Sequence, residues 1–125
     1  NAPDPVTREV SRLAAQDEAR HVAFGLAHLR RHIGLDPGLR PRLAAAVLRR
    51  HEALRNTDGL NEEVLDALVL LAAGSWEPDD LASGHDRVVA LQKDMDRGRR
   101  QRLEKLGFPR DEAESLSGLH TRNFM

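Results

Sequence analysis

Apolar positions recur every three to four residues along most of the chain, and this spacing is typical of α-helices. The clearest example lies between residues 61 and 73, where the apolar side chains fall on one side of a helix: Val64, Leu65, Leu68, Leu71 and Ala72. From residue 79 onwards polar residues interrupt the pattern more often, but the spacing persists. No convincing alternation of apolar and polar residues indicates a strand, so the pattern predicts an all-α fold.

Glycine, proline and cap-forming residues divide this pattern into five predicted helices. Asp4 and Pro5 supply a cap and a first-turn proline for the first helix, and Gly107 ends the fourth. A turn cluster at 56–59 precedes Asn61, the predicted cap of the third helix. The predicted ranges are 6–32, 37–56, 61–73, 79–106 and 110–119. We expect residues 1–125 to form a single all-helical domain or fragment with an irregular tail from residue 120.

Composition narrows the chemistry that the chain can carry. The absence of cysteine excludes disulfides, zinc-thiolate sites and thiol catalysis. A net charge of -1 with 31% charged residues, and only 3% aromatic residues, argue against nucleic acid as a partner. The best apolar run, 64–73, is too short for a membrane span, and the first residues do not resemble a signal peptide. We therefore expect a cytoplasmic protein without a membrane span.

The first predicted helix places ionisable residues within its apolar stripe. The apolar members of the stripe are Val6, Val10, Leu13, Ala14, Phe24 and Leu29. Between them come Asp17, Glu18 and His21, and the last two lie one helical turn apart on the same side. Charged groups on a core-facing stripe are costly unless they are paired or bind a metal. Glu18 and His21 are therefore candidate metal ligands, and the alternative is a surface pair or a hydrogen-bonded buried pair.

A longer run around this pair resembles a known family. Residues 17–21, Asp-Glu-Ala-Arg-His, are similar to the Asp-Glu-x-Arg-His motif of ferritin-like di-iron carboxylate oxidases and oxygenases. That motif occurs in acyl-carrier-protein desaturases, in bacterial multicomponent monooxygenases and in ligand-binding oxidases similar to the ribonucleotide reductase small subunit. The flanking Ala-Phe-Gly at 23–25 looks most like the last group. The resemblance is specific over residues 10–30 and architectural beyond them.

The resemblance implies a role for each matched residue. Glu18 would bind or bridge the metals, and His21 would be a terminal ligand. Asp17 would accept a hydrogen bond from the free ring nitrogen of a metal-bound histidine, and Arg20 would pair with a nearby carboxylate. Val22 and Phe24 would either wall a substrate cavity or belong to the core, and the residues leave both interpretations open.

The resemblance also implies that the metal site extends beyond this chain. The family builds its site from four helices that supply Glu, Glu-x-x-His, Glu and Glu-x-x-His, and only one such motif occurs here. The chain would then be the C-terminal portion of a ferritin-like helical bundle, namely the last ligand helix and the helices after it. Two iron ions, or iron and manganese, would be completed by an upstream half of the bundle or by a partner chain. The expected activity is oxidation of a small-molecule or lipid-like organic substrate by dioxygen, and a homodimer would fit this expectation.

Two other functions stay open. A non-enzymatic helical protein-interaction module would need no metal. A nucleic-acid-binding domain would use the arginine cluster between residues 97 and 102, although a solvated face paired with acidic residues is the plainer interpretation. His28 and His32 continue the side of His21, but histidines near a helix C-terminus are favoured by the helix dipole alone. Trp76 and the apolar end of the tail, 124–125, would contact either the bundle or a partner.

Overall fold

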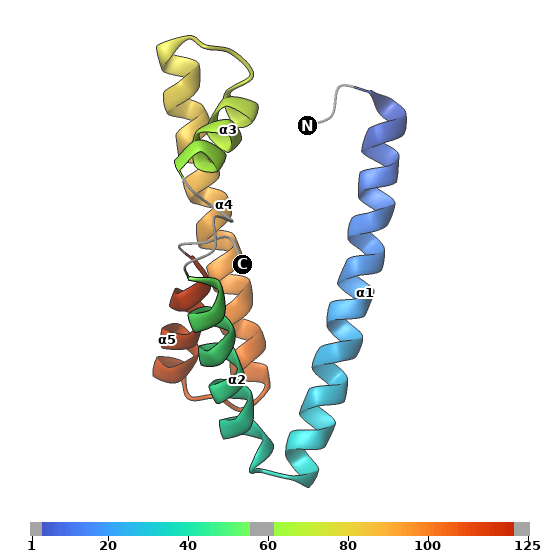
Figure 1. Ribbon diagram of the computed structural model, residues 1–125. Helices are drawn as coiled ribbons and strands as arrows, with labels where there is room; N and C mark the ends of the chain where they lie inside the picture. Colours follow the sequence, from blue (N-terminus) through green and yellow to red (C-terminus); the bar gives the residue numbers. More distant parts are fainter. Residues whose placement is uncertain (1–3, 56–61, 122–125) are drawn as a thin grey trace. The chain divides into compact units, whose positions relative to one another are not determined.

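Every element that the structure describes is an α-helix (Figure 1). The structure, a computed structural model, describes residues 4–55 and 62–121. Its helices are α1 (Pro5–Leu35), α2 (Leu39–Leu54), α3 (Glu62–Ala73), α4 (Pro78–Lys105) and α5 (Arg110–Thr121). The predicted all-α class is therefore confirmed for these residues. The predicted turn at 56–59, the Asn61 cap and the tail from residue 122 lie outside the described residues.

The chain divides into two compact units, residues 1–39 and residues 40–125. Helix α1 makes up most of the first unit. It begins as predicted, because the Asp4 side chain accepts a 2.7 Å hydrogen bond from the backbone N–H of Thr7 and Pro5 occupies the first turn. The helix ends at Leu35 rather than at the predicted His32, because Gly34 keeps a helical backbone. Taken by itself, this unit is one long helix, and none of the residues of α1 is buried.

Two glycines with positive φ end helices in the second unit. Gly74, at φ 78°, follows α3, and Gly107, at φ 86°, follows α4. The N–H of Gly107 donates to the carbonyl of Glu104, and the N–H of Phe108 donates to the carbonyl of Leu103. These two bonds form a Schellman motif, which needs a left-handed residue at the position of Gly107. The short turns at Gly74 and Gly107 reverse the direction of the chain, so that α3 and α5 both pack against α4 (Figure 1).

The packing of α3 against α4 depends on a close backbone approach at Gly84. A Cβ at that position would lie 2.5 Å from the carbonyl oxygen of Val69 and 2.8 Å from the backbone nitrogen of Ala73. A hydrogen bond also connects the two helices: Arg87 Nη1 of α4 donates to the carbonyl oxygen of Ala72, near the end of α3, at 2.8 Å. The bare backbone of Gly84 thus allows the two helices to come together.

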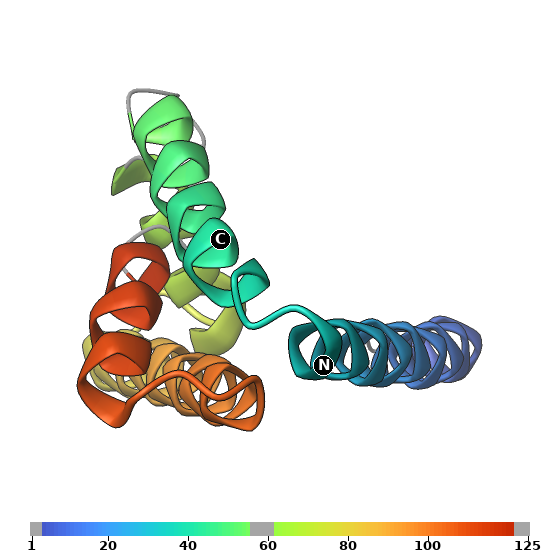
Figure 2. The same ribbon diagram turned by 90° about the horizontal axis from the view of Figure 1, so that it is seen from below.

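The buried core lies mainly where α4 turns into α5. Its apolar members, each less than a tenth exposed, are Val88, Leu106, Phe108, Ala113 and Leu116. Arg40, in the first turn of α2, donates a 2.8 Å hydrogen bond to the carbonyl of Gly107. Helix α2 lies beside α5 in the second view (Figure 2), and its Val47 lines a pocket together with residues of α4 and α5. Residues of α2 and α5 therefore lie near the second half of α4. Within the described residues, no helix combines the length and the apolar character that a membrane crossing requires.

Candidate functional site

The acidic residue and the histidine of the motif approach one another on α1. Glu18 Oε2 lies 3.6 Å from His21 Nδ1, as expected for side chains one turn apart on the same helix. Two donors that share an ion at about 2.1 Å are separated by roughly 3 Å, so a small rotamer change would let both reach one cation. The side chains of Glu18 and His21 are 75% and 78% exposed, so both donors are accessible in the first unit.

The other two residues of the motif pair with each other. Arg20 Nη1 donates a 2.7 Å hydrogen bond to Asp17 Oδ1. The carboxylate that Arg20 contacts is thus the neighbouring one in the motif, and both side chains are largely exposed. An exposed pair of this kind contributes at most about 1 kcal/mol to stability. In the described structure the Arg20 guanidinium contacts Asp17, while the Glu18 carboxylate faces the His21 ring.

The predicted cavity residues sit on the open surface of the same helix. Val22 and Phe24 are exposed, and the ring of Phe24 stacks on His28 with centroids 6.1 Å apart. His28 in turn lies 4.3 Å from the ring of His32. A row of rings therefore runs along α1 beyond the motif. A single helix cannot enclose a cavity, so a wall role for Val22 or Phe24 requires further helices.

The donors of α1 are too few to hold a metal centre alone. In the described parts of the chain, no group of three or more His, Asp or Glu side chains is arranged to hold a metal ion. Glu18 and His21 fit iron or manganese in donor type, since a carboxylate and an imidazole are ligands that both metals accept. They do not fit in number, because a stable di-metal site needs more than two protein ligands. The remaining ligands would have to come from other helices.

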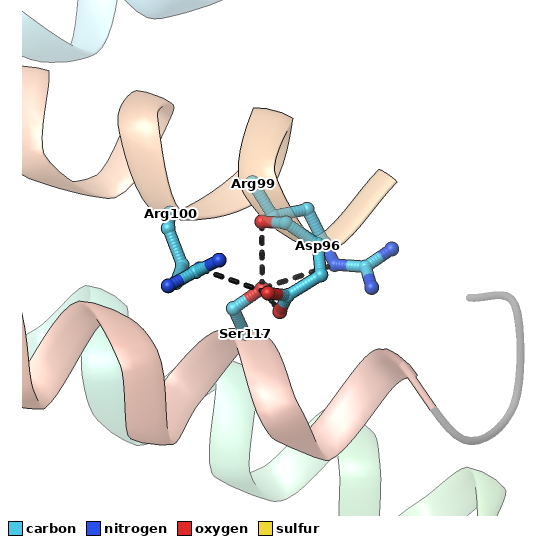
Figure 3. Close-up of polar contacts among 4 residues, drawn as sticks. All are labelled: Asp96, Arg99, Arg100 and Ser117. Atoms are coloured by element: carbon cyan, nitrogen blue, oxygen red, sulfur yellow. Dashed lines mark hydrogen bonds and ion pairs between the residues drawn. The ribbon is translucent and has the colours of Figure 1, made fainter. Parts of the chain in front are cut away.

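A second cluster of polar side chains joins α4 to α5 in the other unit (Figure 3). The hydroxyl of Ser117, which is 0% exposed, donates a 2.7 Å hydrogen bond to Asp96 Oδ1 and accepts a 3.4 Å bond from Arg99 Nε. The other carboxylate oxygen of Asp96 lies 2.8 Å from Arg100 Nε. Arg97, also in the arginine cluster, pairs with Asp94. The sequence indicated acidic partners for these arginines, but nothing in it indicated that Ser117 is buried beside them.

A pocket of about 220 Å³ opens beside this cluster. It is lined by side chains from α2, α4 and α5 and from the turn after α4, namely Val47, Arg99, Arg102, Leu103, Leu106, Leu116 and Ser117. Burial lowers the pKa of the Arg99 guanidinium, the negative charge of Asp96 opposes this effect, and the positive charge of Arg102 adds to it. The sequence did not indicate this pocket, because its residues come from three helices that only the tertiary fold brings together.

Comparison with models of known protein families, with curated proteins and with solved structures finds no match to this chain.

Proposed function

We propose that this chain is the C-terminal part of a ferritin-like di-iron, or iron-manganese, carboxylate oxidase or oxygenase. The observation that carries the proposal is the approach of Glu18 Oε2 to His21 Nδ1 on an accessible side of α1, at 3.6 Å. In this proposal Glu18 would bind or bridge the metals and His21 would be a terminal ligand. The metals, when bound, would supply dioxygen activation, and the rest of the protein would position an organic substrate.

The donor chemistry is compatible with iron or manganese. One carboxylate and one imidazole form a mixed oxygen and nitrogen set that both metals accept, and the absence of cysteine argues against sites that depend on thiolate ligands. The other two charged residues of the motif, Asp17 and Arg20, form an ion pair with each other. In a completed bundle the Asp17 carboxylate would also be available to orient the ring of a metal-bound histidine.

The surface of α1 supports the involvement of further helices. Val6, Val10, Leu13 and Phe24 are exposed in the first unit, although each is a large apolar side chain. Full burial of such a side chain contributes about 1.5–3 kcal/mol, so helices that pack on this face would gain appreciable stability. These helices, in an upstream half of the bundle or a partner chain, would also supply the missing carboxylate and histidine ligands.

The same exposed face supports a second candidate, a non-enzymatic helical protein-interaction module. In that case a partner helix would bury Val10, Leu13 and Phe24, and no metal would be involved. The two candidates differ in the role of Glu18. If Glu18 is a metal ligand, Glu18→Gln removes the carboxylate charge and the protein should lose metal. If the chain is an interaction module, Glu18→Gln should leave stability unchanged or raise it, since burial of an unpaired charge is unfavourable.

Metal analysis of the intact protein, including the helices that complete the bundle, tests the proposal. We expect two metal ions per site in the wild type, and at least a twofold lower iron and manganese content in Glu18→Ala and in His21→Ala. Glu9→Ala and His32→Ala are matched controls, because both residues lie on α1 outside the motif, and they should retain the metal. Unchanged stoichiometry in both ligand variants would reject the assignment, and a metal-free wild type would favour the interaction module.

A further inference from the structure

The second unit has an apolar pocket where α3 turns into α4. Its volume is about 430 Å³, and it is lined by residues of α3, of α4 and of the turn between them, namely Asp66, Ala67, Val69, Leu70, Trp76 and Leu81. All of these residues except Asp66 are apolar. This Trp76 pocket shares no residue with the Glu18–His21 motif or with the pocket beside Ser117, so it is a separate surface of the molecule.

Helix packing and turn hydrogen bonds hold the walls of the Trp76 pocket in place. Val69 belongs to the part of α3 whose backbone meets α4 at Gly84. In the turn, Ser75 Oγ donates a hydrogen bond to the Asp80 carboxylate and accepts a 3.1 Å bond from the backbone N–H of Glu77. The backbone that carries the indole ring is therefore tied to the first turn of α4.

The indole ring is a large apolar surface that remains open to solvent. Trp76 lines the pocket, yet the residue is 78% exposed. Tryptophan is enriched among the side chains that dominate binding energy at protein interfaces, where its ring becomes buried. The face of the ring also attracts the cationic groups of arginine and lysine. The pocket thus offers a site for an apolar side chain and, beside it, a ring face that accepts a cation.

Acidic residues dominate this part of the chain. Residues 63–86 include no lysine or arginine and six carboxylates, which are Glu63, Asp66, Glu77, Asp79, Asp80 and Asp86. Asp66 lines the pocket, Glu63 lies one turn before it on the same side of α3, and Glu77 follows Trp76 directly. The next basic residue, Arg87, donates to the carbonyl of Ala72. Such a surface repels phosphate groups of nucleic acids and anionic lipids and attracts a cationic partner.

We propose that the Trp76 pocket binds a basic amphipathic helix of a partner protein. One large apolar side chain of that helix enters the pocket between Leu70 and Leu81, and its flanking arginine or lysine side chains contact Asp66 and the ring of Trp76. A helix presents apolar and basic side chains one turn apart, which suits a pocket formed between two helices. The proposal does not depend on the proposed metal centre, because the two share no residue.

Fluorescence of Trp76 tests the proposal directly, because this residue is the single tryptophan of the chain. The probe is a tryptophan-free synthetic helix of leucine, alanine and arginine, about 20 residues long so that it is helical by itself. Titrated into the full chain, it should shift the emission of Trp76 to shorter wavelength in a saturable way as the ring becomes buried. A counterpart with glutamate in place of every arginine should cause no shift, and salt at about 0.5 M should weaken binding of the basic peptide.

Paired variants separate docking in the pocket from general attraction between charges. Asp66→Asn should raise the dissociation constant about threefold, as expected when an exposed ion pair is lost. Asp111→Asn removes the same charge from an exposed position on α5 and should leave the dissociation constant unchanged. Ala67→Lys should fill the pocket and raise the constant at least tenfold, whereas Ala90→Lys, on α4 outside the pocket, should change it less than twofold. Ala67 and Ala90 are both exposed, so both lysine variants should fold normally, which circular dichroism checks.

Four outcomes would overturn the proposal. They are no emission shift with the arginine peptide, an equal shift with the glutamate peptide, an equal effect of Asp66→Asn and Asp111→Asn, and an equal effect of the two lysine variants. Sedimentation equilibrium of the full chain tests a different occupant. Self-association that Ala67→Lys abolishes would also overturn the proposal, because the pocket would then hold a second copy of this chain.

Discussion

Ser117 Oγ donates a 2.7 Å hydrogen bond to Asp96 Oδ1, and this bond connects α5 to α4 at a point from which solvent is excluded (Figure 3). Ser117 is the largest fully buried side chain among the described residues. The Asp96 carboxylate also pairs with Arg100, so the hydroxyl satisfies the oxygen that faces α5 while the arginine satisfies the other. A buried polar group of this kind stabilises the fold only when its partners are present.

Replacement of Ser117 by alanine should therefore destabilise the protein. The change leaves Asp96 Oδ1 without the hydroxyl, and we expect the free energy of unfolding to fall by about 1–3 kcal/mol. Urea denaturation followed by circular dichroism measures this difference. Ser115→Ala is the control, because Ser115 is exposed on the same helix, and its effect should stay within about 0.5 kcal/mol. Equal stability of the two variants would contradict a structural role for the buried hydroxyl.

The close approach of α3 and α4 predicts that Gly84 does not tolerate a side chain. In Gly84→Ala the new methyl group would meet the backbone of Val69 and Ala73 at less than 3 Å, and backbone atoms cannot rotate away. We expect a loss of about 1–3 kcal/mol in the free energy of unfolding. Gly118→Ala offers a comparison, since a Cβ there has no neighbour within 4 Å, and the substitution should stabilise α5 by about 0.4–1 kcal/mol. A stabilising Gly84→Ala would show that the helices are farther apart.

The core at the α4–α5 turn predicts a large effect at Phe108. This ring is only 4% exposed, so Phe108→Ala should lower the free energy of unfolding by about 3–5 kcal/mol. Thermal denaturation is the simplest measurement, and it should show a clear drop in the midpoint temperature. Leu71→Ala removes a large apolar side chain that is 79% exposed, and it should change stability by no more than about 0.5 kcal/mol. Similar losses in the two variants would place the core elsewhere.

The N-terminal cap of α1 predicts a dependence on pH at the acidic end. The hydrogen bond from the Thr7 side chain, followed by that from the Thr7 backbone N–H, lowers the pKa of Asp4 below its ordinary value of 3.8. Because the folded pKa is the lower one, the cap stabilises the helix fully above pH 3.8, and the stabilisation is lost as the pH falls through the folded pKa. A carboxyl-detected NMR titration should find Asp4 titrating below 3.8, together with a shift of the Thr7 amide proton.

Asp4→Asn is the matched variant for this titration. Asparagine keeps an oxygen that can cap the helix but has no charge to lose, so the Thr7 amide should no longer respond to acid in this range. A titration midpoint for Asp4 at or above its ordinary value would mean that the cap does not form in solution.

The helices could be predicted from the sequence because their signals are local. The apolar spacing indicated the all-α class, Asp4 and Pro5 marked the start of α1, and Gly107 marked the end of α4. The predicted end of α1 before Gly34 was wrong, because Gly34 keeps a helical backbone and only Gly74 and Gly107 of the described glycines adopt positive φ. Glycine permits the left-handed conformation that often ends a helix but does not impose it. Trp76, which the sequence indicated would contact either the bundle or a partner, is largely exposed in the described structure.

Sequence alone determined the relations between residues one helical turn apart. Helix geometry brings Glu18 to His21 and Asp17 to Arg20, whatever surrounds α1, since such side chains share a side of the helix. The tertiary structure decided the contacts between helices. Ser117 meets Asp96 across 21 residues only because the chain reverses between α4 and α5, and the arginine-lined pocket forms only where α2 joins them. A side chain's partners on another helix depend on turn geometry and packing, which no short stretch of sequence contains.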